Sequence, residues 1–339
     1  MKKIVLDIDY SHNQQLSSFY VGLELLRRKG FIDLSYSFSG SKSAFLFGSV
    51  GEKTFCIDCL DGNNWIVGDR QINLEYFRNE LNTDFILKRS YSSELIPFKP
   101  NSKVFPFGFN YPMGLAYRSH FSHFGQFLTN PYWTLRYFRM LSGYFDYRTF
   151  EAEPALPNTP KILFQVRLWD PSDAKDPVNR EHRVRINQFR IDCLYALKQN
   201  FPKLLIGGVS DSAIARKLCP ELILPSEQVN RNAYFSLVRE SAIGIATTGL
   251  HESIGWKMGE YIAASRAIVS EELNYQVPGE FESGKNYLCF LNTDQLLSHV
   301  DSLVSNPVEI LKMMKENYMY YYHYLRPDQL VWNALKQIQ

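Results

Sequence analysis

The sequence lacks a marked excess of either charge. Its 37 lysines and arginines nearly balance 35 aspartates and glutamates, so the formal net charge over 339 residues is only +2. Nucleic-acid-binding proteins usually carry a strong basic excess, and this balance therefore predicts that the chain binds no nucleic acid. Repeats and low-complexity segments are also absent. With 45% hydrophobic and 21% charged residues, the composition is that of a globular protein and excludes a disordered one.

Cysteine is scarce and scattered. The five residues, an odd number, are Cys56, Cys59, Cys193, Cys219 and Cys289. This pattern is not a disulfide framework, and it suits a reducing compartment. Cys56 and Cys59 form a single C-x-x-C, but a structural zinc site needs four ligands and no second pair follows. We interpret both as strand residues, in preference to a zinc or redox site, and predict no metal site.

Long apolar runs are missing as well. No stretch approaches the length needed to cross a bilayer. The N-terminal residues MKKIVLDIDYS have two lysines but only a short apolar run before Asp7, whereas a signal peptide needs a longer one and a cleavage site. We therefore expect a cytoplasmic protein, soluble or peripheral at the inner face of the membrane.

The length predicts two domains, and the N-terminal half opens as an α/β unit. Residues 3–8 predict a buried strand, and residues 18–29 predict a helix that stops at Gly30. Further short strands are predicted at residues 44–47, 54–58, 85–88 and 103–107. Residues 151–160 contain three prolines and no periodic pattern, which is typical of a linker.

The C-terminal half alternates strands with helices. Strands are predicted at residues 161–166, 203–207, 222–224, 241–246 and 266–270, and helices at 185–199, 211–218, 232–240, 256–264 and 291–304. This alternation indicates a parallel, doubly wound sheet, whose ligands bind at the carboxyl ends of the strands. We predict an N-terminal domain at 1–155, a C-terminal domain at 156–315 and a helical tail at 316–339. The tail is expected to break near Pro327 and to cross back to the N-terminal domain.

Residues 247–273 contain the most informative pattern. A buried strand ends at Ala246, a polar turn containing Gly249 follows, and a helix then runs through Glu260. The unpaired N–H groups and the dipole of a helix start form an anion site, and Gly249 and Gly255 allow the backbone to approach a ligand closely. His251 and Ser253 add donors to this turn, and Lys257 adds a positive charge.

Two carboxylates accompany this anion site. Glu252 and Glu260 are eight residues apart, so on one continuous helix they would lie on roughly one face. A carboxylate at Glu260 can accept hydrogen bonds from the hydroxyls of a ribose. A ligand with phosphate at one end and hydroxyls at the other fits this combination, which favours a nucleotide-sugar. The alternative is that both are surface carboxylates near a helix start, where the dipole stabilises them.

This segment resembles the Glu-x7-Glu motif of retaining GT-B glycosyltransferases, with Glu252 and Glu260 as the two glutamates. The likeness continues through EYIAA, AIVS and FESGKNYLCF and covers about residues 161–339. It implies two Rossmann-like domains that face each other across a cleft. It also implies that Glu260 holds the donor ribose, that Glu252 lies near the donor sugar or the phosphates, and that Gly249, Leu250 and His251, with Thr248, line the diphosphate.

The resemblance suggests further donor contacts. A basic residue after the first strand of the C-terminal domain usually meets the phosphates, and Arg167 stands in a comparable place, although it could instead pair with Asp170. Arg180, Arg183 and Arg185 are alternatives. In the loop after the third predicted strand, Leu224 and Pro225 are placed to contact the nucleobase, and Gly208 borders its pocket.

The N-terminal half offers weaker candidates. Asp9 and His12 follow the first strand, where a base could deprotonate an acceptor in an inverting enzyme, but roles in a turn or a cap are favoured. Asp7 and Asp9 also have the Asp-x-Asp spacing, but they lie outside the nucleotide site. The aromatic stretch at residues 105–150 could form an acceptor or membrane-surface patch, and core packing is the favoured interpretation.

Together these features predict a glycosyltransferase, a hexosyl- or related transferase. It would move sugar from a nucleotide-sugar to a glycan or glycolipid acceptor in surface polysaccharide biosynthesis, of lipopolysaccharide or capsule. No cofactor is expected besides this donor substrate. Two alternatives remain: a nucleotide-sugar epimerase of the same fold, and a non-catalytic nucleotide-sugar-binding protein.

Overall fold

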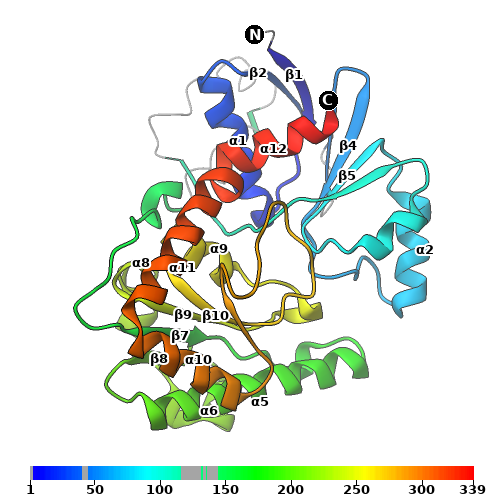
Figure 1. The fold of residues 1–339 in the computed structure, drawn as a ribbon. Coiled ribbons are helices and arrows are strands. Elements are labelled where there is room, and N and C mark those ends of the chain that lie inside the picture. The colour runs from blue at the N-terminus through cyan, green and yellow to red at the C-terminus, as the bar shows by residue number, and fades with distance from the viewer. Residues whose placement is uncertain (1–2, 40–44, 116–130, 133–134, 136–143) are drawn as a thin grey trace. The chain divides into compact units, whose positions relative to one another are not determined.

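The computed structural model describes residues 3–39, 45–115, 131–132, 135 and 144–339. The chain divides into two compact units (Figure 1). Unit 1 comprises Met1–Thr149, Tyr275–Gly279 and Tyr322–Gln339, and unit 2 comprises Phe150–Asn274 and Glu280–Tyr321. The predicted α/β fold class is confirmed, because each unit contains a sheet of mainly parallel strands with helices packed against it.

Unit 1 contains a six-stranded sheet in the order β2-β1-β3-β4-β5-β6. Strand β3 pairs antiparallel with β1 and β4, and the other neighbours pair parallel. The strands are β1 (Ile4–Asp9), β2 (Ile32–Ser37), β3 (Phe45–Val50), β4 (Lys53–Asp58), β5 (Phe85–Lys88) and β6 (Lys103–Pro106). The helices are α1 (Ser17–Arg28), α2 (Arg70–Glu80) and α12 (Pro327–Ile338).

The contact between α1 and α12 holds the C-terminal helix in unit 1. Gly22 of α1 permits it, because a Cβ at that position would lie 2.2 Å from the carbonyl oxygen of Pro327. Lys29 forms an ion pair with the fully buried carboxylate of Asp328 at 2.5 Å. Helix α1 stops as predicted, since Gly30 adopts φ +76° directly after it.

Unit 2 contains a five-stranded, wholly parallel sheet in the order β11-β10-β9-β7-β8. Its strands are β7 (Ile162–Val166), β8 (Leu205–Val209), β9 (Ile243–Ala246), β10 (Ala267–Glu271) and β11 (Leu288–Phe290). Numbered within the unit, the order is 2-1-3-4-5. The chain therefore reverses direction across the sheet between β7 and β9, and a doubly wound sheet binds ligands at the carboxyl ends of the strands at this switch point.

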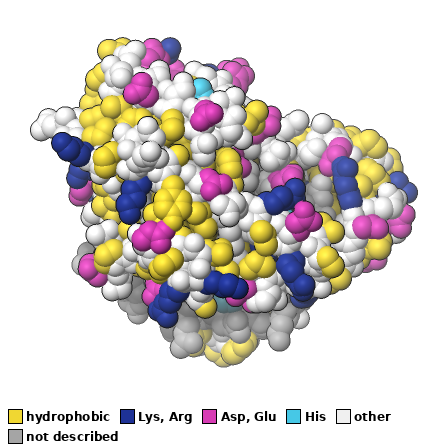
Figure 2. Space-filling model, turned by 90° about the horizontal axis from the view of Figure 1, so that it is seen from below, with side chains coloured by type: hydrophobic (Ala, Val, Ile, Leu, Met, Phe, Trp, Pro, Cys, Tyr) yellow, Lys and Arg dark blue, Asp and Glu magenta, His cyan; other side chains and the backbone are white. Residues whose placement is uncertain are grey.

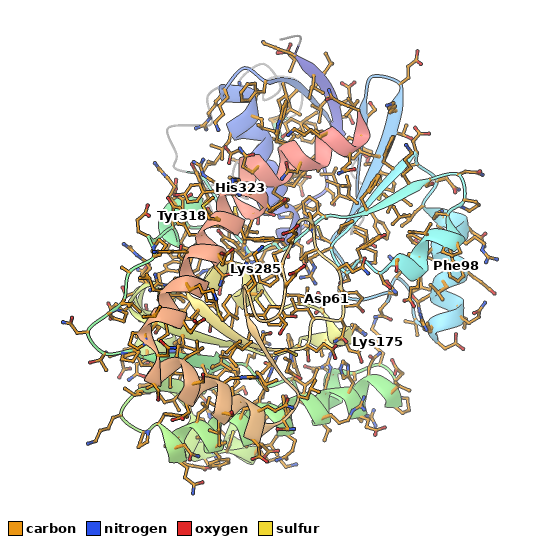
Figure 3. All side chains as sticks on the ribbon, in the orientation of Figure 1. Asp61, Phe98, Lys175, Lys285, Tyr318 and His323 are labelled. Carbon is orange, nitrogen blue, oxygen red and sulfur yellow. The ribbon has the colours of Figure 1, made fainter. Side chains whose placement is uncertain are left out.

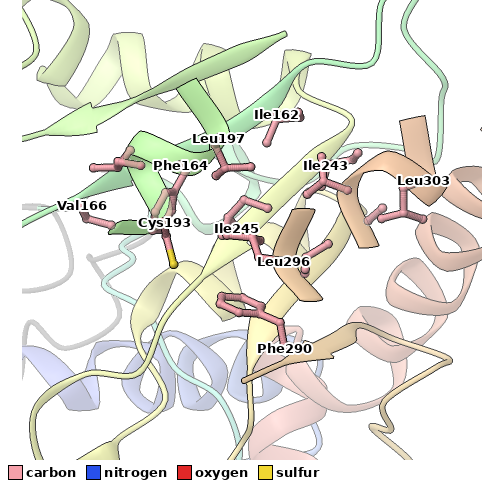
Figure 4. Packing of buried hydrophobic residues seen from close by; sticks show 14 of the residues in the cluster. Ile162, Phe164, Val166, Cys193, Leu197, Ile243, Ile245, Phe290, Leu296 and Leu303 are labelled. Carbon is pink, nitrogen blue, oxygen red and sulfur yellow. The ribbon is translucent and has the colours of Figure 1, made fainter. Parts of the chain in front are cut away.

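Helices cover both faces of this sheet (Figure 1). They are α5 (Pro177–Asn200), α6 (Ala213–Leu218), α7 (Ser226–Val229), α8 (Arg231–Glu240), α9 (Trp256–Ala263), α10 (Thr293–Ser305) and α11 (Pro307–Tyr320). Side chains alternate along β9, so that Ile243 and Ile245 join the core with α5 and α10 (Figure 4) while Gly244 faces Tyr261 of α9. A Cβ at Gly244 would lie 2.6 Å from that ring, so the missing side chain sets how closely α9 packs.

The first residues of unit 2 lie against its own helices. Phe150 packs edge-on against Phe235 of α8 with the ring centroids 4.5 Å apart. Further along, the carbonyl oxygen of Ala152 accepts a hydrogen bond from Ser265 at 2.6 Å. The proline-containing segment that was expected to act as a linker is thus anchored to unit 2. The unit boundary falls between Thr149 and Phe150, and the tail belongs to unit 1 from Tyr322 onward.

One predicted element is wrong, and others were not predicted. Residues 222–224 do not form a strand: Pro220–Leu222 is a 3₁₀ turn, and only Ile223 bridges to Val209. Helix α5 begins at Pro177, eight residues before its predicted start, and Asp176 caps it by accepting from the Asn179 N–H. Strands β2 and β11 and helix α2 were not predicted.

The surface mixes both charges. On the face shown in Figure 2, basic and acidic side chains lie interspersed, with hydrophobic side chains scattered among them. None of the helices in the described ranges is long and apolar enough to span a bilayer. Most of the aromatic stretch considered as a membrane-surface patch, namely residues 116–130, 133–134 and 136–143, lies outside the described residues. In its described part, Phe107, Phe109 and Tyr111 are buried.

Candidate functional site

The loop between β9 and α9 has an unusual backbone. A 3₁₀ turn at Leu250–Glu252 places His251 at φ 56° and Glu252 at φ 59°. Non-glycine residues adopt this left-handed conformation at a cost, and such strain clusters at functional sites. The Gly249 N–H donates to the Ser253 carbonyl at 2.8 Å and closes the loop. Helix α9 starts only at Trp256, so Glu252 and Glu260 do not share one face of a continuous helix.

A buried arginine joins the two loops at the switch point. From α5, the Arg190 guanidinium donates to the Arg167 carbonyl oxygen after β7 at 2.6 Å. It also donates to Thr247 Oγ1 at 3.0 Å and to the Thr248 carbonyl oxygen at 2.9 Å, both after β9. Burial lowers the pKa of Arg190 to about 10, and the charge of Glu271 opposes this effect. Arg190 thereby fixes the geometry of both strand ends.

Glu271 at the end of β10 holds the same loop from the other side. Its carboxylate accepts from the Thr248 N–H at 2.7 Å and from the Thr248 hydroxyl at 3.2 Å. Burial raises the pKa of Glu271, while these two hydrogen bonds and Arg190 act in the opposite direction. Thr248, predicted to contact the donor, is therefore held by three hydrogen bonds, two to Glu271 of β10 and one from Arg190 of α5.

A small hollow opens at the carboxyl ends of β9 and β10. Its walls combine apolar side chains with hydroxyls and carboxylates. They are formed by Ala246, Thr247, Thr248, Glu252, Ile254, Gly255, Met258, Ser270, Glu272 and Leu273. The structure thus brings together the predicted residues Thr248 and Glu252 with the N-cap of α9.

A second polar cluster lies beside α9. Glu260 is buried, and its Oε2 accepts a hydrogen bond from the Tyr234 hydroxyl of α8 at 2.8 Å. Lys257 Nζ donates to the same hydroxyl at 3.1 Å and lies 4.2 Å from the centre of the Tyr234 ring. Burial lowers the pKa of Lys257 to about 8; the Glu260 charge opposes this shift and Arg190 adds to it. Burial also raises the pKa of Tyr234, as does Glu260.

The hollow and this cluster lie on opposite sides of α9. Successive helix residues are rotated by about 100°, so Glu260 points about 160° away from Met258, which lines the hollow. Lys257 and Glu260, three residues apart, are neighbours. A ligand that contacted both the hollow and the cluster would have to lie across the N-terminal end of α9, where the helix begins without a side-chain cap.

His251 in the strained turn lies near a second histidine, His182 of α5. Burial lowers the pKa of His251, and a positive charge on His182 of α5 lowers it further. Burial and Arg185 lower the pKa of His182, while Glu252 opposes them. Both imidazoles are therefore neutral near pH 7. As an uncharged group, the His251 imidazole can donate one hydrogen bond and accept another.

The remaining predicted residues of unit 2 have mixed surroundings. Arg167 is exposed, with its guanidinium 5.1 Å from the centre of the Trp169 ring. Leu224 is half-buried, and Pro225 is exposed at the start of α7. Gly208 is explained by packing, because a Cβ would lie 2.5 Å from the Leu222 carbonyl oxygen. Of the alternative arginines, Arg183 donates to the Asp170 carbonyl oxygen at 2.7 Å.

The candidates of unit 1 have local partners. Asp9 accepts from the N–H and the hydroxyl of Ser39, at 3.0 and 2.6 Å. His12 Nδ1 lies 2.9 Å from the Tyr10 hydroxyl. The two C-x-x-C thiols are buried and free, and burial raises the pKa of both. In the part of the chain that the structure describes, no group of three metal-ligating side chains is close enough to hold an ion.

Sequence reasoning missed Arg190, Glu271 and Tyr234. Arg190 lies on the face of α5 that also carries Ile186, Leu194 and Leu197. A charged residue on an otherwise apolar helix face was the sequence signal that could have identified Arg190. Nothing comparable marked the other two, since their importance follows from contacts across the fold.

Comparisons with known proteins give structural likenesses only. No family description and no curated sequence matches the chain. The C-terminal domain of a glycosyl transferase group 1 family protein (LpcC) from Francisella tularensis is 14% identical with a TM-score of 0.37, over 52% of this chain and 95% of that one. Anabaena Alr3699/HepE in complex with UDP is 12% identical with a TM-score of 0.44, over 83% and 71%.

The complex of the same Anabaena protein with UDP-glucose gives 12% identity and a TM-score of 0.45, over 83% of this chain and 72% of that one. At such identities and scores the likeness is one of architecture and assigns no role to any residue. The chemistry of unit 2 has to be inferred from its own side chains.

Proposed function

We propose that the protein is a GT-B glycosyltransferase whose unit 2 binds a nucleotide-sugar donor. The observation that carries this proposal is a buried carboxylate, Glu260, one turn inside a helix that starts beside the switch point of a doubly wound parallel sheet. A helix start at such a point favours the binding of a phosphate group, whereas a nearby carboxylate disfavours it. A donor with a diphosphate and a ribose satisfies both groups.

The donor would lie across the start of α9. Its diphosphate would face the backbone of Thr248–Ser253, with Arg167 and Lys257 as the nearby cations and His251 and Ser253 as hydrogen-bonding groups. The ribose would reach Glu260, and the nucleobase would approach Leu224 and Pro225. Glu252, at the rim of the hollow, is placed to contact the transferred sugar or its phosphates. By the resemblance in the Glu-x7-Glu spacing, transfer would retain the anomeric configuration.

The acceptor is proposed to be a glycan or glycolipid of surface polysaccharide biosynthesis, met at the inner face of the membrane. The N-terminal half, from residue 1 to about 150, would provide the acceptor side. The division into a donor and an acceptor side is supported by the two α/β units of the chain.

Thermal unfolding in the presence of nucleoside diphosphates and nucleotide-sugars tests the proposal. A ligand at 100 times its Kd stabilises the native state by about 2.7 kcal/mol, so the right base and sugar should raise Tm well above the rest of the panel. Glu260→Gln should reduce this shift for nucleotides, measured against the Tm of the free variant. If no member of the panel stabilises the protein, the proposal is wrong.

Turnover separates the competing functions. With donor alone, an epimerase converts one nucleotide-sugar into another, which nuclear magnetic resonance detects. A transferase leaves the donor intact or hydrolyses it slowly until an acceptor is added. A binding protein shows a Tm shift but no new product under any condition. We expect the second pattern.

A further inference from the structure

The cluster beside α9 has a fixed hydrogen-bond direction. A charged ammonium has only donors, so the Tyr234 hydroxyl must accept from Lys257 at 3.1 Å. The single hydroxyl proton is then donated to Oε2 of Glu260 at 2.8 Å. Burial raises the pKa of Tyr234, so the hydroxyl keeps this proton.

Tyr234 is itself held in place. It lies in the first turn of α8, whose N-cap Asn230 accepts from the Ala233 N–H. Its ring packs edge-on against Phe150 with the centroids 6.5 Å apart, and Lys257 lies over the ring face. The hydroxyl is therefore a fixed donor rather than a mobile one.

The two oxygens of Glu260 are consequently different. Oε2 is bound by Tyr234, whereas within the described residues no protein group donates to Oε1. Each carboxylate oxygen can accept two hydrogen bonds, so the Tyr234 hydroxyl occupies one acceptor position of Oε2 and leaves Oε1 as the oxygen with both positions open to a ligand.

We propose that Tyr234 is the positioning residue that makes ribose recognition in this site one-sided, with Oε1 of Glu260 accepting from only one of the two ribose hydroxyls. The inference rests on the proposed function, because it assumes that the pentose of a nucleotide reaches Glu260. Tyr234 acts through Glu260 and needs no contact with the donor.

Deoxy nucleotides provide the test. UDP, ADP and GDP are titrated calorimetrically into the full chain, each beside its 2′-deoxy and 3′-deoxy forms. For the diphosphate that binds, one deoxy form should lose about 10-fold or more in affinity, as expected for a hydrogen bond to a charged group, and the other should bind within about 3-fold of the parent. If both deoxy forms lost affinity for the wild-type protein equally, this result alone would overturn the proposal.

Tyr234→Phe gives the second arm. Without the hydroxyl, the carboxylate is no longer held, and the two deoxy forms should bind within about 3-fold of each other. A variant that keeps the wild-type ratio overturns the positioning role.

Tyr321→Phe is the matched control, because the buried Tyr321 hydroxyl also donates to a glutamate, Glu151, at 2.9 Å. Its ratio should equal that of the wild type. Tyr318 (Figure 3), whose hydroxyl donates to Glu153 in a more exposed pair, gives a third Tyr→Phe variant with the same expectation.

The failure of this inference can be told apart from that of the proposed function. If none of the parent diphosphates binds to the wild-type protein, the donor site itself is disproved and the inference falls with it. If a diphosphate binds and only the deoxy pattern disagrees, the donor site stands and the role of Tyr234 is disproved.

Discussion

The Lys257 ammonium group should make donor binding dependent on pH. In the free protein its pKa is lowered to about 8 by burial. A bound diphosphate favours the charged form and raises this pKa. The affinity is therefore constant below pH 8 and falls as the pH rises through 8 toward the bound-state pKa, by at most about 10-fold per pH unit. Calorimetry with the diphosphate that binds, from pH 7 to pH 9.5, measures the slope.

Two features make this measurement specific. His182 and His251 both have pKa values below their usual 6.5, so they stay neutral across the whole range. The matched variant Lys257→Met should bind the diphosphate more weakly and with a flat profile. Equal slopes for the wild type and Lys257→Met would show that Lys257 does not meet the phosphates.

Arg190 is the residue on which the geometry of the two loops depends. Arg190→Met leaves the carbonyl oxygens of Arg167 and Thr248 without this donor and the partly buried Glu271 without its nearby cation. Removing one member of a buried charge network costs about 3 to 5 kcal/mol, and we expect a loss in this range on urea unfolding. Arg216→Met is the control, because Arg216 and its partner Asp211 are both exposed and their pairing should contribute little to stability. A comparable loss in both variants would contradict the role of Arg190.

At the level of elements, the close packing of α9 on β9 depends on one missing side chain. Gly244→Ala would place a methyl group 2.6 Å from Tyr261, so α9 must shift or the ring must move. Overpacking of this kind costs about 1 to 3 kcal/mol. We expect this loss on urea unfolding, together with weaker nucleotide binding, because α9 carries Lys257 and Glu260.

Gly255→Ala is the matched control on the same helix. A Cβ there would lie 3.8 Å from its nearest neighbour, the Thr247 carbonyl oxygen, so it fits without movement. Its unfolding free energy should change by less than about 1 kcal/mol. If Gly244→Ala were as stable as Gly255→Ala, the spacing of α9 would not depend on Gly244.

The elements of unit 2 were largely predictable, because β7, β9 and β10 are largely apolar runs and α6 and α8 start at the capping side chains of Ser212 and Asn230. The predicted strand at residues 222–224 failed because Pro220 starts a 3₁₀ turn there, and a single bridge to Val209 remains. The predicted start of helix α5 was too late, because the first turns of this helix are polar. Its real start depends on the cap at Asp176, which periodicity does not detect.

The site was only partly predictable, for a physical reason. The strand, the turn and the helix start around residues 246–260 are local in sequence, so the pattern showed them. The left-handed turn at His251 and Glu252 contains no glycine at those positions, and the sequence gives no signal for it. Arg190, Tyr234 and Glu271 lie 57, 26 and 23 residues from their partners, and only the folded sheet brings them together.

At the scale of the whole molecule, the groups proposed to bind the donor all belong to unit 2. The loops after β7 and β9, the hollow and the cluster around Glu260 lie within Phe150–Asn274. Unit 1 has a separate core that includes Phe77, Ile86 and Val104, and a separate closing contact between α1 and α12. Damage to the core of unit 1 should therefore leave the donor affinity of unit 2 unchanged.

Gly22→Val tests this separation. A Cβ at Gly22 would lie 2.2 Å from the Pro327 carbonyl oxygen and 2.4 Å from Val331, so a valine must displace α12 from α1. Faster hydrogen exchange is then expected in α1 and α12, with unchanged exchange in β7, β9 and α9. The Kd of the nucleoside diphosphate should stay within about 2-fold of the wild type. This is a small change, since 10-fold corresponds to about 1.4 kcal/mol of binding free energy. A loss of affinity while the exchange of unit 2 is unchanged would mean that unit 1 contributes directly to holding the donor.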